Sequence, residues 1–200
     1  MLSNFGKKST VLGAAAAMVA APLLSGALTA NASPERSPAP APEAVLTCDL
    51  SGTAEFSPAL SLNPAGESTQ MKVEGEASGC KGQAARQDEV VSAKFSGDLS
   101  GKMSCTSLPR GVGGDVEITW TYADGSTKTS TADFELNMEG DLSKPSQPIT
   151  GAFTGEGTDG EFKGNKHTGK ADIDPSSLAG GCLTGGVKSM DFSGSYEMSK

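Results

Sequence analysis

The sequence offers few residues for a catalytic centre. His167 is its single histidine, and histidine is the side chain whose ordinary pKa lies closest to neutral pH. It stands in the stretch GNKHTGK, where glycine and lysine favour a solvated loop. The chain has no G-x-S-x-G motif to present an activated serine. We therefore expect His167 to be a surface residue, and we predict no catalytic residue.

Carboxylates are abundant, and two of them facing each other across a sugar would support glycoside hydrolysis. Most of them occupy the polar positions of segments in which polar and apolar residues alternate, which predicts a solvated sheet face. These are Asp49, Glu55, Glu74, Glu76, Asp98, Glu117, Asp133 and Glu135. A secreted hydrolase with a carboxylate pair is kept as an alternative function.

A further acidic group is formed by Asp159, Glu161, Asp172 and Asp174, and carboxylate oxygens are the ligands that Ca²⁺ prefers. Their spacing lacks the D-x-D-x-D-G pattern of an EF-hand loop, so a polar loop is the favoured interpretation. No C-x-x-C pair accompanies His167, which argues against a transition-metal site. The sequence predicts neither a metal nor another cofactor.

The glycine-rich segment 107–115 suggests a second alternative, a secreted protease inhibitor. Arg110 would enter the protease, and Pro109 and Cys105 would brace the loop. An ordinary glycine-rich turn is the favoured interpretation of this segment.

The N-terminal residues resemble a secretory leader. Two lysines precede an apolar, alanine-rich run, and Ala30-Asn31-Ala32 has the small-x-small form of a cleavage site. We predict a signal peptide over 1–32, a proline-rich flexible segment over 33–46 and a single all-β domain over 47–200. Loss of the leader would change the net charge from −8 to −10. Such acidity argues against nucleic acid and anionic membranes as partners.

Alternation of polar and apolar residues dominates from Cys48 onward and predicts antiparallel strands with one buried face. In VSAKFSGDLSGKMSC (91–105) every odd-numbered residue is apolar or glycine. Trp120 and Tyr122 share the apolar parity and are expected in the core. We predict an antiparallel β-sandwich or flattened β-barrel of about eight or nine strands, with two weak edge strands near Phe162 and Ile173. No window after Leu28 has clear helical periodicity.

The cysteines predict two disulfides, because an even number outside the cytoplasm favours bridges over metal binding. They stand at Cys48, Cys80, Cys105 and Cys182. Antiparallel pairing of 48–56 with 71–80 would place Phe56 near Met71 and Cys48 opposite residue 79 or 80. Of the three possible connectivities, the preferred one is therefore Cys48–Cys80 with Cys105–Cys182.

Several stretches resemble a family of small, uncharacterised secreted proteins of actinobacteria. They are GTAEFSPAL, GEASGC, GKMSCTS, EITWTYADGSTKTS and CLTGGVKSMDFSGSYEM, in this order along the chain. The resemblance implies secretion and an all-β domain, and it supplies no catalytic residues. The leading expectation is a secreted, extracellular, non-catalytic β-domain that binds a protein or cell-wall partner or associates with the envelope.

Overall fold

The computed structural model describes residues 44–200 apart from 64, 83–88, 107, 109 and 141–148. The predicted signal peptide and residues 33–43 of the proline-rich segment lie outside these residues. The first strand begins at Ala44, three residues before the predicted start of the β-domain.

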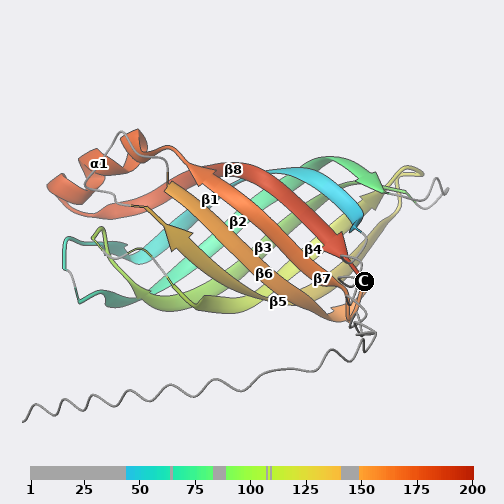
Figure 1. Cartoon of the computed structure of the whole chain (residues 1–200), viewed down its shortest axis with the longest axis horizontal. Coiled ribbons are helices and arrows are strands. Elements are labelled where there is room, and N and C mark those ends of the chain that lie inside the picture. Colours follow the sequence, from blue (N-terminus) through green and yellow to red (C-terminus); the bar gives the residue numbers. More distant parts are fainter. Residues whose placement is uncertain (1–43, 64, 83–88, 107, 109, 141–148) are drawn as a thin grey trace, which may run out of the picture. The chain divides into compact units, whose positions relative to one another are not determined.

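Eight antiparallel strands form a closed barrel in which each strand pairs with the next and the last returns to the first (Figure 1). The strands are β1 (Ala44–Leu60), β2 (Glu67–Gly82), β3 (Val90–Met103), β4 (Val112–Tyr122), β5 (Thr127–Glu139), β6 (Ile149–Gly160), β7 (Lys166–Ile173) and β8 (Val187–Ser199). The predicted antiparallel all-β fold is confirmed in its barrel form. Closure leaves none of these eight described strands at an edge, since each has two hydrogen-bonded neighbours.

Alternation places the apolar residues inside the barrel, as predicted. On β3 the odd-numbered residues from Ala93 to Met103 face inward, and the even-numbered ones from Lys94 to Lys102 are exposed. The parity fails at the start of this strand. Val90 is buried, whereas Val91 is 40% exposed, because the pairing with β4 shifts register between Val90 and Ser92. The prediction that Val91 belongs to the apolar side is therefore wrong.

Four inward-facing phenylalanines lie directly opposite glycines of the adjacent strand. The pairs are Gly52–Phe192, Gly75–Phe95, Phe134–Gly155 and Phe153–Gly169. A methyl group added to any of these glycines would lie within 3.0 Å of a carbon atom of the opposing ring. Each ring therefore packs on bare backbone, an arrangement that glycine alone permits.

Both predicted disulfides are present. Phe56 pairs with Met71, and farther along the same strands Cys48 is bonded to Cys80. The pairing shifts register between Thr47 and Asp49, and Gly79 lies opposite this shift with a φ of 59°. Glycine adopts this left-handed conformation at low cost, which makes the bulge possible.

The second disulfide joins Cys105, in the connection between β3 and β4, to Cys182 in the helix α1 (Pro175–Thr184). α1 lies at the end of the barrel where β8 begins, called the helix end below; the C-terminus lies at the opposite, C-terminal end (Figure 1). No helix among the described residues is long and apolar enough to cross a membrane.

α1 corrects the expectation that no helix follows Leu28. Its signals are short but present: Pro175 opens it, where the missing N–H costs nothing, and Leu178 and Cys182 are four residues apart and both buried. The predicted edge strand near Phe162 is also wrong, because Phe162 lies in the turn between β6 and β7 with a φ of 61°. Ile173 ends β7, which pairs on both sides and is no edge.

We expect Gly75→Ala to lower the free energy of unfolding by about 2 kcal/mol, because the methyl group would overlap both the Phe95 ring and the carbonyl of Ser51. Gly151→Ala is the matched control. Its methyl group would lie 3.3 Å from the movable Cδ1 of Leu136, so the change should stay within about 0.5 kcal/mol. Urea unfolding of the two variants measures the difference, and equal stabilities would contradict the packing described for Gly75.

Candidate ligand site

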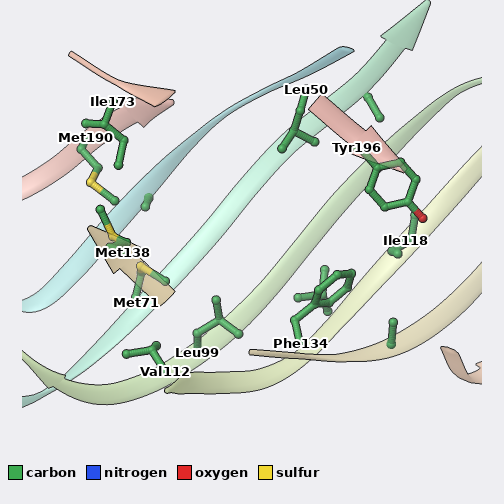
Figure 2. Packing of buried hydrophobic residues seen from close by; sticks show 14 of the residues in the cluster. Leu50, Met71, Leu99, Val112, Ile118, Phe134, Met138, Ile173, Met190 and Tyr196 are labelled. Atoms are coloured by element: carbon green, nitrogen blue, oxygen red, sulfur yellow. The ribbon is translucent and has the colours of Figure 1, made fainter. Parts of the chain in front are cut away.

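The barrel encloses an apolar cavity of about 110 Å³. Every strand contributes to its walls, and the lining residues are aliphatic, aromatic, methionine or glycine. Figure 2 shows Met138, Met190 and Ile173 toward one side of this interior and Tyr196 with Ile118 toward the other. A cavity of this size would admit several waters by volume, but apolar walls give them no hydrogen-bond partners. The space suits an apolar occupant better than water.

The cavity exists because the middle of the barrel is incompletely filled. Five inward-facing side chains that line the cavity are only partly buried and keep part of their surface accessible. They are Val73, Phe95, Leu136, Phe153 and Phe192. Three of these are the rings that cover cross-strand glycines, and a glycine adds no side-chain volume to the interior. The same pairing that closes the barrel therefore leaves space at its centre.

Buried side chains occupy both ends of the barrel interior. At the helix end, Leu178 of α1 is buried together with Met103, Val112 and Ile149. At the C-terminal end the main components are aromatic. The Trp120 and Phe162 rings meet edge to face with centroids 5.1 Å apart, and Trp120 Nε1 donates a 2.7 Å hydrogen bond to Ser130 Oγ.

His167 belongs to this aromatic layer and is 1% exposed. Its Nδ1 lies 2.5 Å from the hydroxyl oxygen of Tyr196. The rings of Trp120, Phe134 and Tyr196 surround the imidazole at centroid distances of 6.5, 5.5 and 5.9 Å. Its other nitrogen, Nε2, is buried and has no hydrogen-bond partner among the described residues.

Burial determines the charge of this pair. It lowers the pKa of His167 to about 4 and raises the pKa of Tyr196 above its usual value, because an apolar environment disfavours the charged form of each group. Both side chains are therefore neutral at pH 7. The barrel interior thus contains a neutral polar pair, of which Tyr196 lines the cavity and His167 does not.

The prediction that His167 is a surface residue is wrong. His167 lies on β7 and faces inward in the same parity as Gly169, Ala171 and Ile173. That alternation is visible in HTGKADI, but the flanking lysines and glycines outweighed it. Trp120 and Tyr122, by contrast, are buried as predicted.

The carboxylates lie outside the barrel, as their parity predicted. All eight acidic side chains assigned to the solvated face are exposed. One row crosses three strands, since Asp115 pairs with Asp133 and Asp133 with Glu156. These residues stand on an open surface, and no carboxylate lines the cavity. Among the described residues, Asp133, Glu135 and Glu156 line a separate, more open hollow rather than the barrel cavity.

The acidic group considered for calcium is dispersed. Asp159 and Asp172 point outward from β6 and β7, and Glu161 forms a 3.1 Å ion pair with Lys128. Within the described ranges no three potential metal ligands come together.

The segment proposed as an inhibitor loop is seen only in part. Arg110 is exposed, and the backbone N–H of Gly111 donates a 2.9 Å hydrogen bond to Asn137 Oδ1. Ser107 and Pro109 lie outside the described residues. β4 begins at Val112, so the last part of the predicted loop is strand.

Comparison with known proteins adds no assignment: no protein-family model, curated protein or solved structure matches this chain. The barrel interior, with its cavity and the His167–Tyr196 pair, is therefore chosen as the candidate site from its geometry alone.

The buried histidine predicts an acid-sensitive barrel. The pKa of His167 is about 4 in the folded chain and 6.5 in an unfolded one, so the unfolded state binds more protons between these values. Stability should be complete above pH 6.5 and fall by roughly 3 kcal/mol toward pH 4. Urea unfolding across this range tests it. In His167→Phe the free energy of unfolding should lose this dependence on pH. A pH profile identical to that of the wild-type protein would contradict the assignment.

Proposed function

We propose that this chain is a secreted, non-catalytic binding protein that holds a small apolar molecule inside its barrel. The observation that carries the proposal is the cavity of about 110 Å³ with apolar walls. Eight-stranded barrels have interiors just wide enough for side chains or one small ligand. Here the side chains leave part of the interior empty, so an occupant would gain contacts without displacing well-bonded water.

Several features support the extracellular placement. The leader and cleavage motif over 1–32 favour export, and the two disulfides are consistent with an oxidising compartment. The outward positions of the strands carry mostly charged and hydroxyl side chains, which keeps the barrel surface solvated. The resemblance to secreted actinobacterial proteins points the same way.

A protease-inhibitor role is the second candidate, because Arg110 is exposed and Cys105, earlier in the same connection, is anchored through the disulfide to Cys182. It would show as stoichiometric inhibition of a trypsin-like protease that Arg110→Ala abolishes. Association with a protein or cell-wall partner would instead be detected by pull-down with the intact protein from its own secretome.

Ligand binding can be followed by the fluorescence of Trp120, the single tryptophan, which lines the cavity. We expect methylcyclohexane, which does not absorb where tryptophan does, to change this emission saturably. Ala171→Leu places a larger side chain on the cavity wall and should weaken binding at least tenfold, about 1.4 kcal/mol. Ala152→Leu adds the same group to the outer face of β6 and should have no effect. A signal that does not saturate, or equal effects of the two variants, would refute a binding site in the barrel.

Export makes a separate prediction. The mature protein recovered from the culture medium should begin at Ser33 and contain no free thiol. Intact-mass spectrometry with and without alkylation measures both, and retention of residues 1–32 in the medium would contradict the predicted cleavage.

A further inference from the structure

The walls of the cavity offer a ligand no hydrogen-bonding group. Two of the lining residues, Trp120 and Tyr196, carry a polar atom on an aromatic ring. Trp120 Nε1 donates to Ser130 Oγ, and the Tyr196 hydroxyl is hydrogen-bonded to His167 Nδ1. Neither Ser130 nor His167 lines the cavity, and among the described residues no polar atom faces this space. A ligand inside the barrel therefore has to bind without hydrogen bonds.

Walls of this kind select against polar and charged ligands. A hydroxyl or carboxylate buried without a partner loses its hydration and gains nothing in return. Within the described part of the chain, no Lys, Arg, Asp or Glu side chain is buried, so a charged head group would also find no counter-charge. The cavity therefore suits a hydrocarbon.

The volume of the cavity limits this hydrocarbon to a single ring. Enclosed apolar cavities of roughly 150 Å³ stay dry and bind benzene, and this one measures about 110 Å³. A six-membered ring with one small substituent would require small rotamer adjustments of the lining side chains. Methionine makes such adjustments readily, because its side chain is unbranched and has three rotatable bonds.

The side chains around the cavity favour an aromatic ring over a saturated one. Some of the lining rings already pair with one another, as Phe134 does with Phe153, nearly edge to face at a centroid distance of 5.8 Å. Aromatic rings at such distances attract one another by more than the burial of their surface provides. The chain has seven Phe, two Tyr and one Trp, and six of these ten residues line the cavity: Phe95, Trp120, Phe134, Phe153, Phe192 and Tyr196. An aromatic ligand can join this network, whereas a saturated ring cannot.

Three methionines also line the cavity. Met71, Met138 and Met190 come from β2, β5 and β8. Figure 2 shows them toward one side of the interior, with Phe134 and Tyr196 toward the other. The thioether sulfur is polarisable and makes favourable contacts with aromatic rings. Both sides of the cavity therefore favour an aromatic occupant.

We propose that the ligand is a small aromatic hydrocarbon, a single ring about the size of toluene without a polar substituent. This inference rests on the proposed function and adds the chemical class of the ligand to it. The absence of a hydrogen-bonding group in the described walls excludes polar ligands, and the rings and methionines select the aromatic one.

The methionine methyl groups provide a test in the wild-type mature protein, so that no variant has to fold. Five of the seven methionines follow the predicted leader. Met71, Met138 and Met190 line the cavity, whereas Met103 and Met198 do not. Toluene should shift the ¹³C-labelled methyl signals of the first three, because the ring current of an aromatic molecule acts on nuclei in contact with it. The other two should move far less. Equal shifts of all five signals, or no shift, would overturn the proposal.

The preference for an aromatic ring is measured with two probes of the same carbon skeleton, toluene and methylcyclohexane. Each dissociation constant is multiplied by the partition coefficient of the probe from water into hexadecane, which removes the difference in hydration. After this correction, toluene should bind about tenfold more tightly. If methylcyclohexane binds and the corrected constants are equal, the aromatic assignment fails while the proposed function stands. If neither probe binds, the proposed function fails as well.

Phenol tests the exclusion of polar groups, because its hydroxyl replaces the methyl group of toluene with little change of shape. We expect phenol to bind about a hundredfold more weakly than toluene, since the hydroxyl would lose water without gaining a partner. Phenol binding as tight as that of toluene would reveal a hydrogen-bonding group in the cavity and overturn the assignment to a hydrocarbon.

A pair of variants tests the part played by sulfur. Met138→Leu removes one sulfur atom from the wall and keeps its apolar bulk, so the corrected preference for toluene should fall about threefold. Met103→Leu is the matched control, because Met103 is buried but does not line the cavity. It should leave the preference unchanged, and equal preferences in the two variants would overturn the role given to Met138.

Discussion

The packing of aromatic rings on glycine backbone is the constraint on which the rest of this barrel depends. At Gly52, Gly75, Gly155 and Gly169 a phenylalanine ring of the neighbouring strand occupies the place of the missing side chain. A strand that carries a glycine can bend and twist sharply, and closing an eight-stranded barrel requires such curvature. The ring restores part of the apolar contact that the glycine gives up.

The same constraint determines the interior. A glycine that faces inward contributes curvature but no volume, so a barrel built in this way closes tightly and packs loosely at its centre. The inward rings of Phe95, Phe153 and Phe192 therefore retain accessible surface, and an apolar cavity lies between them. Ordinary cores are packed to near-crystalline density, and a void lined by rigid elements is the form that small-molecule sites usually take. The candidate function thus follows from how the fold is closed.

Much of the fold could be predicted from the sequence because strand alternation is a local property. It placed Trp120 in the core, and it gave the register that brings Cys48 opposite Cys80. It could not distinguish a barrel from a sandwich, since both bury one face of each strand.

The candidate site was harder to predict. The cavity depends on the summed side-chain volumes around a whole ring of strands, and His167 was misplaced because lysines and glycines beside it suggested a loop. α1 was missed because, among its side chains that the structure describes, Leu178 and Cys182 alone are buried.

The two disulfides have a consequence for the survival of the chain in a medium that contains proteases. Cys48–Cys80 and Cys105–Cys182 close covalent rings over residues 48–80 and 105–182. A single backbone cut inside either ring leaves both new ends attached to the same molecule, so no fragment can diffuse away. Together the rings span the connections from β1 to β2, from β3 through to β7, and into α1. A single cut at any one of these connections therefore leaves every strand needed to enclose the cavity covalently attached.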